Sequence, residues 1–390
     1  MDKKFKHHSL IDKVYKRLNL YIAYEKVKAN RGAGGVDRVS LEGFERNLEP
    51  NLEELHRLLY EDKYEPLPVK RVYIPKPNGD KRPLGIPTIR DRVAQQALLN
   101  RLGKIFEAKF CECSYGFRPQ RNCRQAIEKV DEYLRKGYQW VVEVDIGKFF
   151  DTVDQQILMR LVYEEISDGR VLRLIKKFLE AGILEEGKVI YQGSGTPQGG
   201  NLSPLLANIY LHPYDEEMTT KGYNLVRYAD DVVILCKTKE EAEEALSLTS
   251  QILENRLKLR LNPDKTNLRH EQEGFEFLGH YFGCGYSHFK TPRRKSVVAF
   301  KDRIRRLTRR LQPKKMTTVI EEITPVIRGW GQYFARSNCR GVFGSLDHWI
   351  AHRLSAFKLR KWGGYEHQKY TPYFLKEMGL ISLVDILGTS

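Results

Sequence analysis

Two adjacent aspartates, Asp230 and Asp231, constrain the fold more than any other feature of the chain. The tetrapeptide at 228–231 reads Tyr-Ala-Asp-Asp, and short apolar runs occupy 225–226 and 232–236. This pattern predicts two antiparallel strands joined by a tight turn. Adjacent carboxylates repel each other, and a hairpin turn would ordinarily use Asn-Gly or Asp-Gly. The pair is therefore either a solvated acidic turn or a site for a divalent cation such as Mg²⁺.

A second acidic position upstream favours the cation. Residues 140–145 (Trp-Val-Val-Glu-Val-Asp) read as a strand that ends at Asp145. Acidic residues at the ends of neighbouring strands can hold two cations, as in-line phosphoryl transfer by a two-metal site requires. The two acidic positions together are typical of such a site if their strands are neighbours.

Most of the net positive charge lies in one C-terminal segment. The chain carries 66 Lys and Arg against 50 Asp and Glu, a net charge of +16. Residues 290–362 account for +15 of it, with 19 Lys and Arg against 4 Asp and Glu. This density predicts a polyanionic partner, most simply nucleic acid, and a merely solvated basic surface is the alternative.

The same segment has apolar residues at helical spacing. In residues 300–311 they recur every three or four positions with arginines between them, and Pro313 ends the run. Thr318 and Ser345 are predicted to cap two further helices. We therefore expect a separate bundle of three amphipathic helices with basic outer faces.

The rest of the chain mixes helices and strands unevenly around the central hairpin, which predicts an α+β fold and not a doubly wound sheet. A Pro-Asn-Gly-Asp turn at 77–80 joins the first two strands, and Ser203 is predicted to cap a helix that continues with Pro204. Predicted helices cover 10–65 (interrupted by a glycine loop at 31–37), 90–110, 125–135, 239–257 and stretches from 155 and 203, and predicted strands cover 71–74, 84–86, 140–145, 225–236 and 258–261.

Other features exclude several classes of protein. The six cysteines have no paired C-x-x-C spacing, which argues against a zinc finger or a nuclease with structural zinc. Free thiols fit a reducing, cytoplasmic location. No run approaches ~18 apolar residues, so no membrane span is predicted. The charged N-terminus lacks the apolar stretch of a secretory signal.

Seven ordered blocks of the sequence resemble a known family, the reverse transcriptases of the group II intron-encoded kind. The basic C-terminal segment is similar to that family's thumb, or maturase, domain, and the chain resembles the compact bacterial members without an endonuclease domain. The blocks are residues 73–87, 115–119, 144–151, 195–210, 228–231, 261–266 and 275–279, and the thumb-like strings are 329–334 and 346–349.

The resemblance implies a right-hand polymerase with fingers, a palm on an antiparallel sheet, and an all-helical basic thumb. The implied divisions are an N-terminal extension at 1–65, fingers and palm at 66–289, thumb at 290–362 and a short segment at 363–390. The implied reaction extends a DNA or RNA primer along an RNA template with dNTPs. Group II intron RNA is the implied second partner, in splicing and retrohoming. No membrane partner is expected, and the oligomeric state, a dimer included, is left open.

The resemblance also implies roles for residues at the acidic site. Asp145, Asp230 and Ile146 match the positions that hold two Mg²⁺ ions, for which Mn²⁺ could substitute. Asp231 matches a third acidic residue that is less directly bound. Lys265 matches a lysine that would protonate pyrophosphate, or it is an ordinary surface lysine.

Further matches concern the incoming nucleotide. Phe150 matches the ring beneath the sugar that excludes a 2′-OH. Gln198, in a glycine-rich loop, would approach the nascent base pair. Four cations on or beside the predicted fingers hairpin would bind the triphosphate or form a solvated face: Lys70, Lys76, Lys81 and Arg82.

Five arginines of the thumb-like segment are predicted to bind nucleic acid from one helix. Because they span most of the circumference left by its apolar face, we expect only a subset to contact phosphates. They are Arg303, Arg305, Arg306, Arg309 and Arg310.

The chain departs from the family pattern beside the first aspartate. The family's Asp-Ile-Lys-Gly-Phe-Phe is here Asp-Ile-Gly-Lys-Phe-Phe at 145–150, with Gly147 and Lys148 in exchanged order. The spacing to Phe150 is kept, so we expect activity with an altered local backbone. The loop at 31–37 resembles the extension that covers the template strand in non-retroviral enzymes, or it belongs to a helical lid with an exposed glycine turn.

Two classes of function share these features. One is an RNA-directed DNA polymerase, and the other is a splicing-only maturase that binds intron RNA without polymerising. Intact Asp145, Asp230 and Asp231 favour the polymerase. A domesticated or CRISPR-associated enzyme of the same lineage stays open, because the sequence carries no genomic context.

Overall fold

The protein is described by a computed structural model that covers residues 6–75, 81–191, 193–196, 199–359 and 371–388. The chain forms two compact units, each described by itself. The N-terminal unit comprises Met1–Tyr133 and Trp140–Leu268, and the C-terminal unit comprises Leu134–Gln139 and Arg269–Ser390. The four divisions expected from the sequence stay a prediction.

Helices begin the N-terminal unit, as the sequence predicts. They are α1 (Ile11–Tyr15), α2 (Arg17–Asn30), α3 (Leu41–Arg46), α4 (Leu48–Tyr60) and α5 (Ile89–Glu107). Helices α2 and α5 pack together through an apolar core, and the buried Asn19 amide donates to the carbonyls of Val14 (2.8 Å) and Ala97 (3.1 Å). Those bonds satisfy a polar group inside the core.

The loop after α2 is fixed to the start of α5. Arg92 donates to the carbonyl of Pro87 at 3.1 Å and also to that of Ala33. Thr88 caps α5 by accepting the Asp91 N–H at 3.1 Å.

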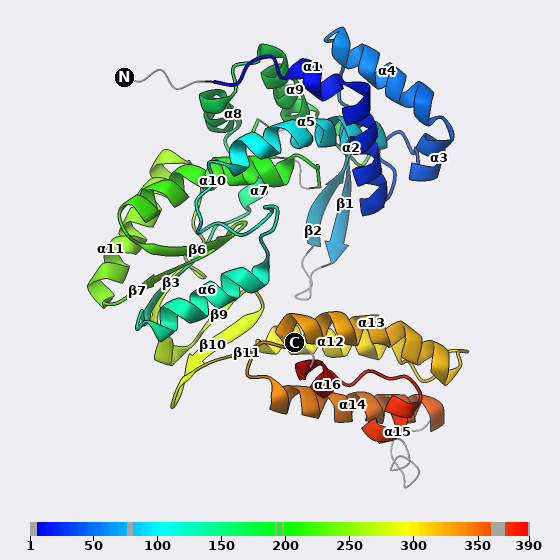
Figure 1. Ribbon diagram of the computed structural model, residues 1–390, viewed down its shortest axis with the longest axis vertical. Helices are drawn as coiled ribbons and strands as arrows, with labels where there is room; N and C mark the ends of the chain where they lie inside the picture. The colour runs from blue at the N-terminus through cyan, green and yellow to red at the C-terminus, as the bar shows by residue number, and fades with distance from the viewer. Residues whose placement is uncertain (1–5, 76–80, 192, 197–198, 360–370, 389–390) are drawn as a thin grey trace. The chain divides into compact units, whose positions relative to one another are not determined.

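A long hairpin projects from these helices (Figure 1). Strands β1 (Val69–Pro75) and β2 (Lys81–Ile86) pair antiparallel, which confirms both predicted strands. Strands β4 (Ile183–Glu185) and β5 (Lys188–Ile190) extend the sheet in the order β2-β1-β4-β5. The predicted turn at 77–80 lies outside the described residues.

The central sheet has the order β6-β7-β3-β8 and carries the acidic motifs. Strands β3 (Trp140–Asp145), β6 (Asn224–Tyr228) and β7 (Asp231–Cys236) pair antiparallel, and β8 is Asn267–His270. Helices α10 (Ser203–Thr220) and α11 (Lys239–Ser250) pack against it, and a π-helix follows at Gln251–Arg256. Helix α6 is Cys123–Arg135. The predicted α+β class is therefore confirmed, and Cys236 in β7 is a buried free thiol.

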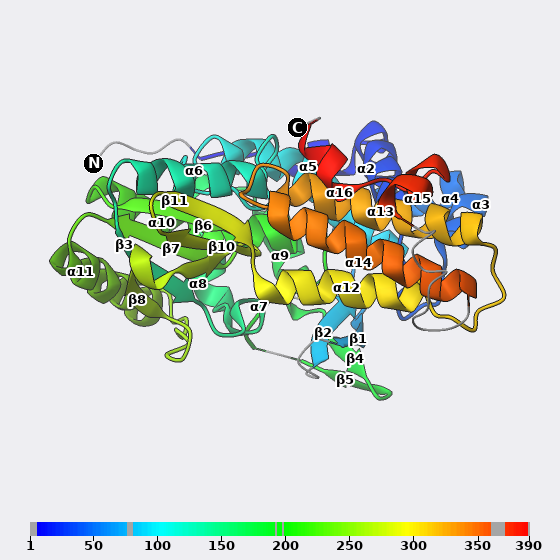
Figure 2. The ribbon, with the colours of Figure 1, turned by 90° about the horizontal axis from the view of Figure 1, so that it is seen from below.

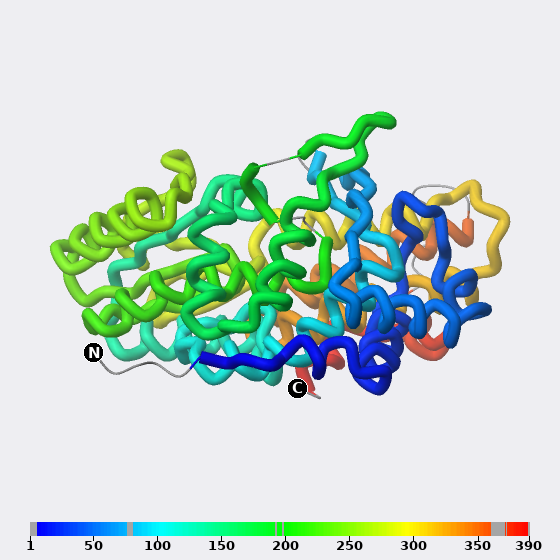
Figure 3. The backbone as a smooth tube through the Cα atoms, turned by 90° about the horizontal axis from the view of Figure 1, so that it is seen from above, coloured from blue at the N-terminus to red at the C-terminus, as the bar shows by residue number. Residues whose placement is uncertain are grey.

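Three helices follow β3 along the chain: α7 (Phe149–Thr152), α8 (Gln155–Glu165) and α9 (Gly169–Glu180). Asp154 and Asp168 cap α8 and α9. The first described residues run beside this pair (Figure 3), where His7 exchanges backbone hydrogen bonds of 2.8 Å with Glu165 and Ser167. The N-terminus is thereby attached to α8–α9.

The C-terminal unit combines a three-stranded sheet with a helical bundle. The sheet is β11 (His288–Pro292), β10 (His280–Cys284) and β9 (Phe275–Phe277). Helices α12 (Arg294–Leu307), α13 (Met316–Phe334) and α14 (Arg340–Leu359) lie side by side (Figure 2). Helices α15 (Pro372–Glu377) and α16 (Leu383–Leu387) close the bundle. Its apolar core includes Ile304, Ile323, Ile327, Phe343, Ile350 and Leu354.

Two predicted helix starts, at Thr318 and Ser345, are wrong because tertiary packing overrides local capping. The third, at Ser203, is right, and only its predicted cap is wrong. Helix α13 begins before Thr318, and α14 begins before Ser345. Met316 and Phe343, upstream of those residues, are buried in the bundle, so packing extends both helices. Helix α10 has no side-chain cap from Ser203, and Leu202 takes the N-cap position.

Two further boundaries also differ from the prediction. The helix predicted at 300–311 ends at Leu307, and Leu311 is 89% exposed. The strand predicted at 258–261 does not form; Lys258 has a left-handed φ of 54°, and Leu261 makes an isolated bridge to Ile146. That φ interrupts an extended chain even though Leu259 is buried as a strand residue would be.

Across the described ranges, every helix is too short or too polar to span a lipid bilayer.

Candidate active site

Strand register brings the three acidic residues to one edge of the central sheet. Asp145 ends β3 and lies directly opposite Asp231, the first residue of β7. Tyr228 of β6 also pairs with Asp231, so Ala229 and Asp230 form a two-residue turn. Ala229 has a left-handed φ of 57°, which closes the turn without a glycine. The three carboxylates therefore lie at one edge of the sheet. The sequence predicts this arrangement on the condition that β3 and β7 are neighbours, and they are.

The electrostatics of Asp230 reflect this crowding. Burial raises the pKa of Asp230 above its ordinary value, the charge of Asp145 acts in the same direction, and Arg82 acts in the opposite one. A divalent cation would relieve the repulsion between the carboxylates. Carboxylate oxygens are ligands that Mg²⁺ prefers, so the residues fit such an ion.

Ile146 can offer a cation only its backbone carbonyl. The Asn262 N–H donates to the Asp145 carbonyl at 2.8 Å, and the Gly147 N–H donates to the Arg260 carbonyl at 2.9 Å. Because backbone groups alternate in direction along an extended segment, the Ile146 carbonyl is directed away from residues 260–262. It therefore faces the side of β3 on which β7 lies.

A buried guanidinium holds the acidic turn from behind. Arg227 is fully buried, forms an ion pair with the equally buried Asp215, and donates to the Ala229 carbonyl at 3.0 Å and to Asn208 Oδ1 at 2.9 Å. Sequence reasoning missed this group. The available signal was one arginine between apolar residues of a predicted strand, because a charge in such a place needs a buried partner.

Gly116 makes the close approach to this turn possible. A Cβ at Gly116 would lie 2.3 Å from the Ala229 nitrogen, so a larger residue could not pack here. The Gly116 carbonyl accepts from Asn208 Nδ2 at 2.9 Å. The network joins the block at 115–119 to α10 and the turn, contacts that the sequence motifs do not reveal.

Lys265 lies beside the acidic cluster. Its amine is 3.5 Å from Asp145 Oδ2, and its side chain is 65% exposed. The Asp145 N–H donates to Thr266 Oγ1 at 3.3 Å. The structure thus places Lys265 next to the acids while leaving its amine accessible from solvent.

The two phenylalanines after the exchanged pair have different environments. Phe149 is buried and contacts Tyr210, whereas Phe150 is partly buried at the edge of the core. The Phe150 carbonyl accepts the Thr196 N–H at 2.7 Å. A Cβ at Gly195, where φ is +86°, would lie 2.9 Å from that carbonyl. The glycine-rich loop therefore packs directly on the Phe150 backbone.

Lys148 adopts a left-handed conformation, with φ 50° and ψ 44°, at the start of α7. The exchange with Gly147 therefore puts a lysine where the family order has a glycine. A side chain there costs about 1–2 kcal/mol relative to the right-handed region. The local backbone change that the exchanged order predicts would thus lie at Lys148.

The fingers hairpin carries exposed cations. Lys70 lies in β1, and Lys81 and Arg82 lie in β2. Of these, Arg82 has a charge that acts on Asp230. The predicted Lys76 and Gln198 lie outside the described residues.

Comparison with known proteins identifies the family. The reverse transcriptase (RNA-dependent DNA polymerase) family matches residues 74–282, more than half of the chain, and the group II intron maturase-specific domain matches residues 297–374. The chain belongs to the group II intron reverse transcriptases. As a reverse transcriptase, it is an RNA-directed DNA polymerase of a family that depends on divalent metal and acts on nucleic acid.

Named relatives agree with this assignment. Protein YkfC of Escherichia coli is 38% identical over 285 residues, covering 63% of this chain and 74% of YkfC. The group II intron-encoded protein LtrA of Lactococcus lactis is 32% identical over 345 residues, covering 69% of this chain and 57% of LtrA. The chain thus spans little more than half the length of LtrA.

Among solved structures, a chain of a partial Cas6-RT-Cas1–Cas2 complex is 26% identical, with 64% of this chain and 43% of that chain covered and a TM-score of 0.40. A score at this level supports no conclusion.

Two pockets flank the glycine-rich loop of the reverse transcriptase. One, of about 280 Å³, is lined by residues from the loop after α2, from β2 and from the glycine-rich loop, among them Arg31, Gly85, Arg92 and Gly199. A Cβ at Gly199 would lie 2.3 Å from the Gly85 carbonyl, so the loop rests on β2. The predicted N-terminal loop therefore lies beside the fingers strands.

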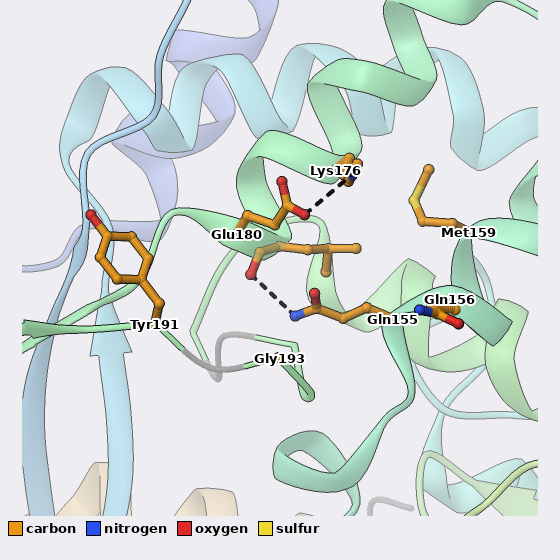
Figure 4. A pocket seen from close by; sticks show the side chains of 8 residues that line it. Gln155, Gln156, Met159, Lys176, Glu180, Tyr191 and Gly193 are labelled. Carbon is orange, nitrogen blue, oxygen red and sulfur yellow. Dashed lines mark hydrogen bonds and ion pairs between the residues drawn. The ribbon is translucent and has the colours of Figure 1, made fainter.

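The second pocket, of about 620 Å³, is lined by side chains of α8 and α9 together with Tyr191 and Gly193 (Figure 4). Gln155 spans one side by donating to the carbonyls of Leu179 (3.2 Å) and Gly195 (3.0 Å). None of the proposed metal ligands lines it.

The five predicted arginines are all exposed, but one helix does not carry them all. Arg303, Arg305 and Arg306 lie in α12, whereas Arg309 and Arg310 follow its end. The expectation of a single helix is wrong because α12 ends at Leu307. Arg305 stacks over the Trp349 ring at 5.5 Å and pairs with Asp302 at 2.5 Å.

A guanidinium cluster on this surface was missed in the sequence. Burial lowers the pKa of Arg353, and the charges of Arg305 and Arg310 lower it further. Arg353 donates to the Thr308 carbonyl at 2.8 Å. The three like charges gathered here fit a surface that binds a polyanion.

Proposed function

We propose that this reverse transcriptase extends a primer with dNTPs along an RNA template, using a two-metal centre at Asp145, Asp230 and the Ile146 carbonyl. The observation that carries the proposal is the register that sets Asp145 opposite Asp231, with Asp230 in the adjoining turn. Asp231 would be a third, less direct ligand. Mg²⁺ is the proposed metal, with Mn²⁺ as a substitute.

The two ions, when bound, would polarise the α-phosphate and favour ionisation of the primer 3′-OH. Arg227 would hold the acidic turn in place through the Ala229 carbonyl. Lys265 would donate a proton to the leaving pyrophosphate, a role supported by the 3.5 Å between its amine and Asp145 Oδ2. Arg82, Lys70, Lys81 and Lys76 would bind the triphosphate.

Phe150 is the proposed barrier to a 2′-OH, and Gln198 the proposed contact to the nascent base pair. Phe150 is supported by its partial exposure beside the deeply buried Phe149. Its backbone is also fixed by the bond from Thr196.

The basic C-terminal unit would bind template–primer duplex and group II intron RNA, aiding splicing and retrohoming. The match to the maturase-specific domain and the exposed arginines support this role. In domain terms, the proposal assigns fingers and palm to 66–289 and thumb to 290–362. It locates the protein in the cytoplasm and leaves a dimer open.

Primer extension by the Asp230→Asn variant tests the polymerase. Losing one charged ligand should cost several kcal/mol, a fall of about a thousandfold in extension rate. Intron-RNA affinity should stay unchanged, because no basic residue is altered. Asp12→Asn, an exposed acid in α1, is the matched control and should extend normally. Near-normal extension by Asp230→Asn would contradict the assignment.

The same variant separates the polymerase from a splicing-only maturase. If RNA binding in the C-terminal unit suffices for splicing, Asp230→Asn should lose extension and keep intron splicing. A wild-type protein that promotes splicing but never extends a primer would favour the splicing-only function.

A further inference from the structure

Three potential ligand side chains meet in the C-terminal unit. Cys284 ends β10 and His288 begins β11, and the two residues are directly opposed in the antiparallel register. Opposed residues of a hairpin project from the same face. Glu271, the first residue of a short 3₁₀ turn at Glu271–Glu273, meets that pair.

The ligand atoms of these residues lie within 4.8 Å of one another, which no other trio of His, Cys, Asp or Glu side chains achieves in the described parts of the chain. The three donors are a thiol, an imidazole and a carboxylate. A set of sulfur, nitrogen and oxygen donors suits a transition metal, Zn²⁺ above all, and differs from the all-oxygen acids of the polymerase site.

Glu271 gives the second, independent indication of a ligand. It is 3% exposed, and its Oε2 atom has no partner at good hydrogen-bond geometry among the described residues, although the Cys284 thiol interacts with the same carboxyl group. His288 Nδ1 lies 2.9 Å from that oxygen, yet it too makes no hydrogen bond. The two atoms are thus close without hydrogen-bond geometry. A buried carboxylate oxygen left in this state is costly, because it has lost its water without a full replacement.

We propose that Glu271, Cys284 and His288 form a zinc site that is separate from the polymerase chemistry. Zinc bonds of about 2.0–2.3 Å in a tetrahedron separate ligand atoms by roughly 3.3–3.8 Å, within the span of this cluster after small side-chain shifts. Three protein ligands leave a fourth position for water. The His288 side chain is 25% exposed, so the site is reachable from solvent.

The zinc would fasten three segments of the C-terminal unit together. The Glu271 N–H donates to the Gln139 carbonyl at 2.8 Å, which ties the 3₁₀ turn to the segment before β3. The metal would add the tip of the β10–β11 hairpin to this attachment. Its role would be structural, and metal binding would add to the free energy of unfolding of this unit.

Metal titration of the full-length protein tests the site. Protein stripped with a chelator and kept reduced is titrated with Co²⁺, whose thiolate charge-transfer band reports a cysteine ligand, and with Zn²⁺ in equilibrium dialysis. We expect wild type to bind one equivalent of metal and the Co²⁺ form to show the thiolate charge-transfer band. Cys284→Ser should abolish the band, and His288→Gln should weaken binding by about tenfold to a hundredfold.

Two controls and a second readout keep the test decisive. Tyr286→Ala, at the exposed tip of the same hairpin, and Cys111→Ser, a thiol elsewhere, should bind as wild type does. Zn²⁺ should raise the thermal unfolding midpoint of wild type and of Tyr286→Ala but not of Cys284→Ser. Glu271→Gln is not used, because Glu271 is buried and its replacement could itself disturb folding.

Two results would overturn the proposal. In one, wild type takes up no Zn²⁺ or Co²⁺ at micromolar concentration, and the cluster is an ion pair between Glu271 and His288. In the other, the band follows Cys111, or Cys284→Ser and His288→Gln bind as wild type does, and the metal is adventitious.

Discussion

The acidic turn of the N-terminal unit and the arginine-rich surface of the C-terminal unit use charge in opposite ways. Around the turn, Arg227 and Asp215 are fully buried. Arg227 bonds at once to Asp215, Asn208 and the Ala229 carbonyl, so these groups hold one another in position. On the bundle, Arg303, Arg306 and Arg309 are exposed. The buried arrangement fixes the positions of a few atoms at the turn. The exposed arginines create a positive electrostatic potential over a surface.

The physical reason is the surrounding dielectric. A buried ion pair is stable only with good geometry and complete hydrogen bonding, so removing one partner is costly. Exposed charges are screened by water and salt, so each contributes little and several act together. The comparison predicts large single-residue effects at the turn and additive, salt-dependent effects on the bundle.

The largest expected effect is at Arg227. Arg227→Met leaves Asp215 buried without its partner and should lower the free energy of unfolding by about 3–5 kcal/mol. Urea denaturation of the variant and of wild type measures this loss of free energy of unfolding. Primer extension should also fall, because the Ala229 carbonyl loses its donor.

The double variant Arg227→Met with Asp215→Leu separates these two losses. With no charge left in the core, stability should recover in part. Extension should stay low, because the turn still lacks its guanidinium. If extension returned with stability, Arg227 would serve the fold alone.

The next effect in size concerns the bundle. Replacing Arg303, Arg306 and Arg309 together by Gln should flatten the dependence of log RNA affinity on log salt by about 1.5 to 2.5 units. Arg305 is left in place because it packs on Trp349 and pairs with Asp302. Filter binding across a salt series measures the slope.

A charge-matched control removes three exposed lysines of the N-terminal unit: Lys104, Lys221 and Lys239. It should leave the slope nearly unchanged if binding depends on the bundle. Equal flattening in both triple variants would show that net charge, and not this surface, governs RNA binding.

A smaller effect is expected at Phe150. Phe150→Val should increase ribonucleotide use relative to deoxyribonucleotide use by about tenfold, which is about 1.4 kcal/mol. The backbone bonds that fix this residue do not depend on its ring. Single-nucleotide insertion kinetics with dNTP and rNTP give the ratio.

Phe149→Leu is the matched control, since its ring lies in the core. It should lower stability and leave sugar discrimination as it is. Unchanged discrimination in Phe150→Val would assign the barrier to another residue.

The smallest expected effect is at Lys148. Lys148→Gly should stabilise the protein by roughly 0.5–1 kcal/mol, because relief of the left-handed conformation exceeds the entropy cost of glycine. The urea midpoint reports the change. Lys148→Ala keeps the Cβ and should not stabilise; if it did, the amine and not the backbone would be the source of strain.

Much of the polymerase could be predicted from the sequence because its determinants are local. Short apolar runs define β3, β6 and β7, and the position of Asp145 at a strand end and of Asp230 in the adjoining turn follows from the same pattern. The apolar faces of α13 and α14 also follow from their periodicity. Short-range spacing is enough for each of these features.

The features that sequence reasoning missed depend on contacts between distant segments. Helix starts moved away from Thr318 and Ser345 because buried residues upstream extended the helices. The segment at 258–261 failed as a strand because the φ of Lys258 turns the chain. At the two helices, packing outweighed a local capping preference of about 1 kcal/mol.

The sequence by itself determined the family, the α+β class and which acidic residues were candidates to hold a cation. Only the tertiary structure decided that Asp145 opposes Asp231, that Arg227 holds the turn, and that Glu271 meets Cys284 and His288. A spacing pattern reports periodicity within one segment, whereas pairing between segments depends on how their surfaces pack. Whether a charge can be buried depends on this pairing between segments, because the free energy of a buried charge is set by partners that the local sequence does not contain.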